Sequence, residues 1–179
     1  MILSQRLLIV VFLLSLLSCG HKQEKKTEKI NGQKVLAEKL IEANKQSVAV
    51  ENEQIEKLLA TSTWKMTETA TGLRYELLEK GHGHKITTGN IVRFEYAVKL
   101  LTGENIYSSD KDGPKEIKVG SGGIESGLEE GLLYLRGGDK ARFVIPSYLA
   151  YGLTGDQNKI PPKSTLIYNV KITDIKTDK

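Results

Sequence analysis

The chain has 179 residues, a single cysteine and a formal net charge of +4. This length favours one globular domain with additional segments, and one cysteine excludes both an intrachain disulfide and a zinc site built from several cysteines. Lysines between residues 21 and 65 alternate with glutamates, a pattern that is typical of a solvated surface and argues against nucleic-acid binding.

Residues 1–18 have the pattern of a secretion signal. Arg6 precedes an apolar run over residues 7–17, which is too short for a membrane-spanning helix of about 20 residues. The run ends in Leu16-Leu17-Ser18-Cys19, which resembles the cleavage box of bacterial lipoproteins. The resemblance implies lipidation of Cys19 and a protein anchored to a membrane of the bacterial cell envelope, facing the periplasm.

Two segments lie between this signal and the main domain. Residues 19–33 are polar and charged, and we expect a flexible tether there. Residues 34–66 form a helical segment, in which apolar spacing predicts one or two amphipathic helices over 34–61, with the two-helix alternative broken near 48–51. The residues that carry this spacing are Leu36, Leu40, Ile41, Val48, Ile55, Leu58 and Leu59.

The apolar stripe of the 34–61 segment has two interpretations. It packs on the domain that follows, or it joins two copies of the chain into a homodimer. Trp64 and Met66 are expected to fix the junction with the next domain.

Residues 67–179 form the main domain, in which apolar and polar residues alternate. Four alternating segments, at 73–77, 92–100, 141–145 and 166–172, predict antiparallel strands with one face in water. Apolar residues at helical spacing over 124–135 predict one short helix. The fold class is therefore α+β, with an antiparallel β half-barrel wrapped on that helix.

The sequence lacks the patterns that covalent, phosphate or metal chemistry requires. Ser147 has no G-x-S-x-G context, and the glycine-rich stretch 120–123 lacks the Lys-Ser/Thr ending of a phosphate loop. His82 and His84 have no further metal ligands nearby. We expect no metal and no cofactor.

Several short stretches of the main domain occur in a distinctive order. They are VRFEY (92–96), GENIYSS (103–109), GLEEGL (127–132), IPSYLAYG (145–152), IPP (160–162) and STLIY (164–168). Together, over roughly residues 70–177, they resemble the FK506-binding-protein (FKBP) family of peptidyl-prolyl cis-trans isomerases. The resemblance implies an enzyme that assists the folding of Pro-containing exported polypeptides. The alternative is a chaperone-like module that binds Pro-containing segments without catalysis.

The resemblance also implies a set of site residues. Tyr151 would donate its hydroxyl to the carbonyl near the proline, and Tyr96 and Tyr168 would line the pocket. The implied substrate-binding residues are Ile106 and Tyr107 in the wall, Ile124 at the helix entrance, Glu125 through its backbone N–H, Leu128 in the floor and Ile160 in the flap.

Several of these positions depart from the family pattern. Leu128 replaces the usual Trp, Ile106-Tyr107 replaces Phe-Asp, Glu125 replaces an aliphatic residue and Lys115 replaces an aromatic one. We therefore predict a pocket that is wider, less aromatic and differently charged.

Overall fold

The computed structural model describes residues 21–177, so the predicted signal and the predicted lipidation site, Cys19, lie outside the described residues. The chain divides between Ala49 and Val50 into two compact units. Within the described part of the chain, no helix combines the length and the apolar character needed to cross a membrane.

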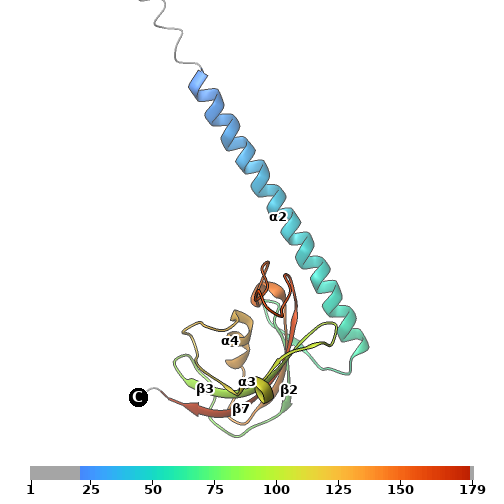
Figure 1. Cartoon of the computed structure of the whole chain (residues 1–179), viewed down its shortest axis with the longest axis vertical. Coiled ribbons are helices and arrows are strands. Elements are labelled where there is room, and N and C mark those ends of the chain that lie inside the picture. Colours follow the sequence, from blue (N-terminus) through green and yellow to red (C-terminus); the bar gives the residue numbers. More distant parts are fainter. Residues whose placement is uncertain (1–20, 178–179) are drawn as a thin grey trace, which may run out of the picture. The chain divides into compact units, whose positions relative to one another are not determined.

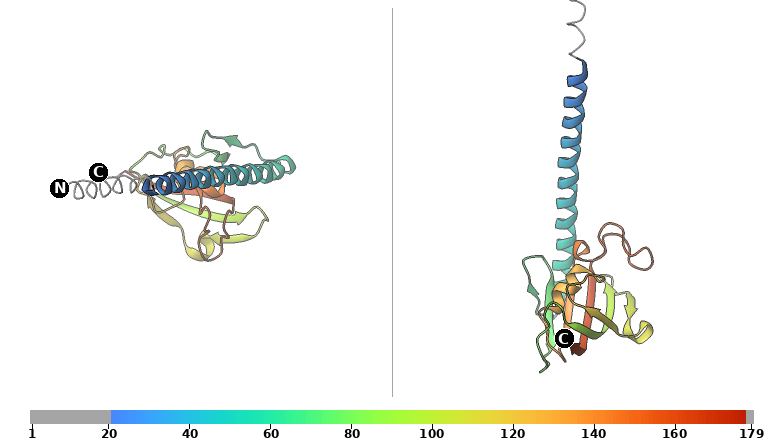
Figure 2. Two further views of the ribbon diagram at one scale, coloured as in Figure 1. Left: turned by 90° about the horizontal axis from the view of Figure 1, so that it is seen from above. Right: turned by 90° about the vertical axis from the view of Figure 1, so that its left-hand side faces the viewer.

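Helix α2 (His21–Thr61) is continuous, and it confirms the helix expected over 34–61 (Figure 2). The tether expected over 19–33 is wrong for residues 21–33, and the break near 48–51 is absent. The reason lies in helix propensity: residues 21–61 contain no proline and one glycine, Gly32, and they are rich in Lys, Glu, Gln and Ala.

Seven antiparallel strands form one sheet in the order β1-β2-β6-β7-β3-β4, with β5 pairing with β3 (Figure 1). They are β1 (Thr67–Glu68), β2 (Arg74–Glu79), β3 (Ile91–Leu100), β4 (Asn105–Ser108), β5 (Lys115–Lys118), β6 (Lys140–Ile145) and β7 (Leu166–Lys176). The four predicted strands are confirmed. The strands β1, β4 and β5 were not predicted, because two to four residues are too few to show an alternation.

Helix α4 (Ser126–Leu132) is the predicted short helix, and it packs against the sheet. Two glycines allow this close packing. A Cβ on Gly131 would lie 2.7 Å from the Phe143 ring, and one on Gly127 would lie 2.5 Å from Ile145. The antiparallel sheet with its short helix confirms the predicted α+β class. Two single turns, α3 (Ser109–Asp112) and η2 (Ser147–Leu149), follow β4 and β6.

The other face of β6 and β7 is buried as well. Val144 and Ile167 are register partners, and they form a second apolar cluster with Ile55 of α2. Leu58, Leu59, Leu101, Trp64 and Met66 pack around this cluster, so Trp64 and Met66 do lie at the predicted junction. The expectation of one wet face is therefore wrong here, because the end of α2 covers the face that would otherwise meet water.

Strand β2 differs from its predicted pattern. Arg74 was expected on the wet face, but it is only 2% exposed, whereas Leu77 is 44% exposed. The Arg74 guanidinium is stabilised in this position by Asn52 Oδ1 at 2.6 Å and Glu56 Oε1 at 2.8 Å, both on α2, and by Glu68 at 3.2 Å. Because a buried cation needs such partners, the last turns of α2 and strand β2 depend on each other.

We predict that Gly131→Ala destabilises the protein, although alanine favours helices. The added methyl would overlap the buried Phe143 ring, and overpacking of this kind costs about 1–3 kcal/mol in the free energy of unfolding. Urea denaturation measures this loss. The double variant Gly131→Ala/Phe143→Leu is expected to lose less than the sum of the two single changes. Strict additivity would contradict the packing described for α4.

Candidate functional site

Four tyrosines that come from different elements meet around one cavity of about 250 Å³. Tyr96 lies on β3, Tyr107 on β4, Tyr151 in the segment after η2, and Tyr168 on β7. The same cavity is lined by Val98, Asp112, Lys115 and Asp156. The fold thus brings together the three predicted catalytic tyrosines and one of the predicted substrate-binding residues.

A buried carboxylate, that of Glu125, lies next to this tyrosine cluster and binds one of its hydroxyls. Glu125 precedes helix α4 and is only 6% exposed, and its Oε1 accepts a hydrogen bond from the Tyr168 hydroxyl at 2.5 Å. Its Oε2 is buried and has no hydrogen-bond partner among the described residues. A buried acceptor of this kind is costly, because it has lost water without gaining a donor.

Burial raises the pKa of the Tyr168 and Tyr151 hydroxyls well above the ordinary value, and the charge of Glu125 beside them raises both further. Burial also raises the pKa of Tyr96, with smaller contributions from Asp112 and Glu125. These three phenols therefore stay protonated through the physiological pH range, and each can act as a hydrogen-bond donor.

A second phenol–carboxylate pair lies at Tyr107. The Tyr107 hydroxyl donates a short hydrogen bond to Asp156, and this bond is the main cause of the raised pKa of Tyr107. Burial disfavours the charged form of Asp156, but donors outweigh it and lower the pKa of this carboxyl. The donors are the Tyr107 hydroxyl and the backbone N–H groups of Ile160, at 2.7 Å, and Asn158, at 2.9 Å.

Two lysines lie over tyrosine rings of the cavity. Lys115 Nζ is 5.1 Å from the centre of the Tyr96 ring, and Lys159 Nζ is 5.0 Å from the centre of the Tyr107 ring. Cations over ring faces at such distances attract the π-system. The wall residue that the resemblance marks as a departure, Lys115, therefore brings a charge to the cavity in place of an aromatic ring.

The remaining predicted residues lie around the cavity and not among its lining residues. Leu128 and Ile106 are buried in the main core, and Ile124 packs against that core. Ile160 is also buried, and its backbone N–H fixes the Asp156 side chain. These residues contribute the apolar support on which the tyrosines rest.

Two acidic residues of the cavity, Asp112 and Asp156, were not identified from the sequence. Asp156 follows Gly155 in a polar stretch, and an aspartate that binds backbone N–H groups further along the chain is a recognised turn signal. That signal predicts a turn and says nothing of Tyr107, which lies 49 residues away. Asp112 likewise begins a turn signal, Asp112-Gly113-Pro114, which does not indicate that it lines the cavity.

Several known proteins are similar to this chain in sequence or in fold. Residues 83–173, about half of the chain, match the model of the FKBP-type peptidyl-prolyl cis-trans isomerase family. The chain is 32% identical over 139 residues to a probable FKBP-type isomerase FkpA of Neisseria meningitidis, covering 76% of this chain and 51% of that protein. It is 36% identical over 108 residues to a probable FKBP-type isomerase of Haemophilus influenzae, covering 60% and 44% respectively.

The crystal structure of FkpA from Escherichia coli is also similar. It aligns with a TM-score of 0.64 and 28% identity, over 97% of this chain and 82% of that one. The chain spans about half the length, or less, of the curated relatives it matches.

We predict that Tyr168→Phe destabilises the protein by about 1–3 kcal/mol, because the buried Glu125 carboxylate loses its donor. Adding Glu125→Leu to Tyr168→Phe is expected to recover most of this loss, since two apolar side chains need no partner. Urea denaturation of the wild type, both single variants and the double variant gives the coupling energy. An equal cost of Tyr168→Phe with and without Glu125 would contradict the interaction.

Proposed function

Because the chain belongs to the family of FKBP-type peptidyl-prolyl cis-trans isomerases, we propose that it accelerates rotation about X-Pro peptide bonds in the four-tyrosine cavity. The observation that carries this proposal is the meeting of Tyr96, Tyr107, Tyr151 and Tyr168 around one cavity. The Pro-containing segment of a polypeptide would enter that cavity with its proline between the rings.

The reaction explains why such a cavity suffices. Rotation about the X-Pro bond faces a barrier of about 18–20 kcal/mol, because the amide loses its resonance when it twists. The twisted amide separates less charge across C–N than the planar one does, so surroundings poor in water favour it. Aromatic rings supply these surroundings, and a phenol that remains protonated donates to the carbonyl. No nucleophile, metal or cofactor takes part in this step.

Tyr151 is the donor that this mechanism requires. Burial and the neighbouring Glu125 raise the pKa of its hydroxyl, which keeps the proton in place at neutral pH. Glu125 precedes α4, and its backbone N–H is the second donor proposed for a substrate carbonyl. Leu128, on α4 and buried in the core, would take the floor position.

A second candidate function is a binding module that holds Pro-containing segments without useful catalysis. The hydrogen bonds of the cavity favour this alternative, because Tyr168 already donates to Glu125 and Tyr107 already donates to Asp156. Hydroxyls bonded in this way bind a peptide less readily than free ones. Tyr151 and the ring faces would then contribute to the affinity for a Pro-containing segment and not to catalysis.

We also propose that the protein acts on exported polypeptides in the bacterial cell envelope, facing the periplasm and anchored through lipid on Cys19. This proposal is supported by the apolar run at 7–17 and by the residues that precede Cys19. A diacylated or triacylated cysteine holds a protein on a membrane firmly, since each buried methylene contributes about 0.8 kcal/mol.

The isomerase proposal is tested with the chain from residue 20 onward and short Ala-X-Pro-Phe peptides, by NMR exchange. Wild-type protein is expected to accelerate isomerisation. Tyr151→Phe should weaken transition-state binding by about 1 kcal/mol, which corresponds to a roughly fivefold lower kcat/KM. Tyr134→Phe, which removes the hydroxyl of a half-exposed tyrosine outside the cavity, is the matched control. Wild-type rates equal to those in buffer would reject the enzyme and leave the binding module.

Helix α2 motivates a separate proposal, a homodimer. Val35, Leu36, Leu40 and Ile41 are between 45% and 62% exposed, and a second copy of the chain would cover them. Sedimentation equilibrium at micromolar concentration is expected to give twice the mass of one chain. Leu36→Glu/Leu40→Glu should give a single chain, whereas Glu38→Lys on the same helix should not. A monomeric wild type would reject the dimer.

A further inference from the structure

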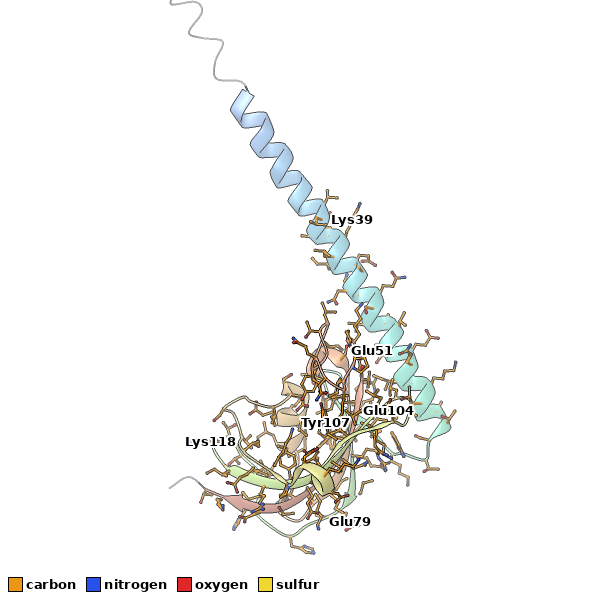
Figure 3. All side chains as sticks on the ribbon, in the orientation of Figure 1. Lys39, Glu51, Glu79, Glu104, Tyr107 and Lys118 are labelled. Carbon is orange, nitrogen blue, oxygen red and sulfur yellow. The ribbon has the colours of Figure 1, made fainter. Side chains whose placement is uncertain are left out.

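One carboxylate of helix α2 binds both ends of the segment that carries Tyr151. Glu51 Oε1 accepts hydrogen bonds from the Ser147 backbone N–H at 2.6 Å and from the Thr165 hydroxyl at 2.5 Å. Glu51 Oε2 accepts a third from the Ser147 hydroxyl at 2.8 Å. Figure 3 shows Glu51 on the helix. Residues 147–165, here called the cleft loop, therefore begin and end on one side chain.

The hydrogen bonds continue through the cleft loop and return to Glu51. The Ser147 carbonyl accepts from the N–H of Gly152, the residue after Tyr151, at 2.8 Å. The Gly152 carbonyl in turn accepts from the Lys163 N–H at 2.8 Å, two residues before Thr165. The circuit runs from Glu51 through Ser147, Gly152 and Lys163 to Thr165, and the backbone of Tyr151 lies within it.

The position of Glu51 does not depend on the cleft loop. Ile55, one turn further along α2 on the same face, is fully buried against Val144 and Ile167. Asn52 and Glu56 on the same turns bind the buried Arg74. The helix end is thus fixed by apolar packing and by the ion pair between Glu56 and Arg74, independently of the contacts that Glu51 makes.

The groups that donate hydrogen bonds to Glu51 need an acceptor. Ser147 and Thr165 are both buried, so their polar groups cannot turn to water when the carboxylate is removed. A loop whose two ends lose their hydrogen bonds gains freedom along its whole length. The side chains it carries into the cavity, Tyr151 and Asp156, would share that freedom.

We propose that Glu51 is a positioning residue of the cavity, which acts through Ser147 and Thr165 to hold Tyr151 in place. The residue lies outside the segment 83–173 that matches the family, so the last turns of α2 become a working part of the site. The kinetic part of the test rests on the proposed isomerase activity, and the exchange part does not.

The experiment compares the chain from residue 20 onward with its variants Glu51→Ala, Glu51→Gln and Thr165→Val. Amide hydrogen exchange is read at Gly152 and Lys163, with the amides of β3 and β7 as an internal reference. Glu51→Ala should speed exchange at Gly152 and Lys163 about tenfold relative to that reference, since hydrogen bonds to a charged group are lost. Glu51→Gln keeps one oxygen acceptor and should fall between Glu51→Ala and wild type, as should Thr165→Val, which removes one donor.

The kinetic arm uses the same proteins and an Ala-X-Pro-Phe peptide. Glu51→Ala should lower kcat/KM at least fivefold, with partial recovery in Glu51→Gln, and Glu53→Ala, at an exposed position two residues along α2, should equal wild type. Unchanged exchange at Gly152 and Lys163, or equal acceleration in β3 and β7, would overturn the role of Glu51. An inactive wild type with the expected exchange pattern would instead reject the isomerase and leave the positioning role standing.

Discussion

The antiparallel pairing of β6 with β7 places buried residues on both faces of the sheet at once. Phe143 and Tyr168 are register partners on one face, and Val144 and Ile167 are partners on the other. The first face receives helix α4 and forms the cavity, while the second receives Ile55 at the end of α2. Because successive side chains along a strand point to opposite faces of the sheet, a register shift of one residue would turn each buried side chain to the other face. The packing on both faces would then be lost.

The pKa shifts at the cavity depend on how each carboxylate is placed relative to the neighbouring tyrosine hydroxyls. At Asp156 burial is the largest single effect, but the Tyr107 hydroxyl and the backbone donors together outweigh it and lower the pKa of the carboxyl. Next to Glu125, burial is the larger cause of the raised pKa of Tyr168 and Tyr151, and the charge of the carboxylate raises both pKa values further. Both arrangements keep the phenols protonated. A cavity built this way supplies donors without a strong base, which suits the proposed isomerisation because that reaction moves no proton.

The long elements could be predicted from the sequence, whereas the contacts between the elements could not. Alternation over the ten residues of β3 is enough to predict a strand, whereas the four residues of β4 are not. Tyr151 and Tyr168 could be placed through motifs that lie close together in the chain. Glu51 and Ser147 lie 96 residues apart, and no local pattern links a helix glutamate to a loop amide at that separation. Arg74 looked like a surface residue, since periodicity does not reveal that Asn52 and Glu56 cover it.

The boundaries of the folding unit follow from burial and not from family likeness. Residues 83–173 match the family, yet the compact unit begins at Val50. Strand β2 lies outside that match and still pairs with β6 over most of its length, and its Arg74 requires acceptors on α2. If α2 ended before Asn52, the buried guanidinium would lose its two partners on the helix and keep only Glu68 and the Gly72 carbonyl, and removing the partner of a buried charge is strongly destabilising. The end of α2 and the sheet therefore fold as one body, and the cavity is built on both.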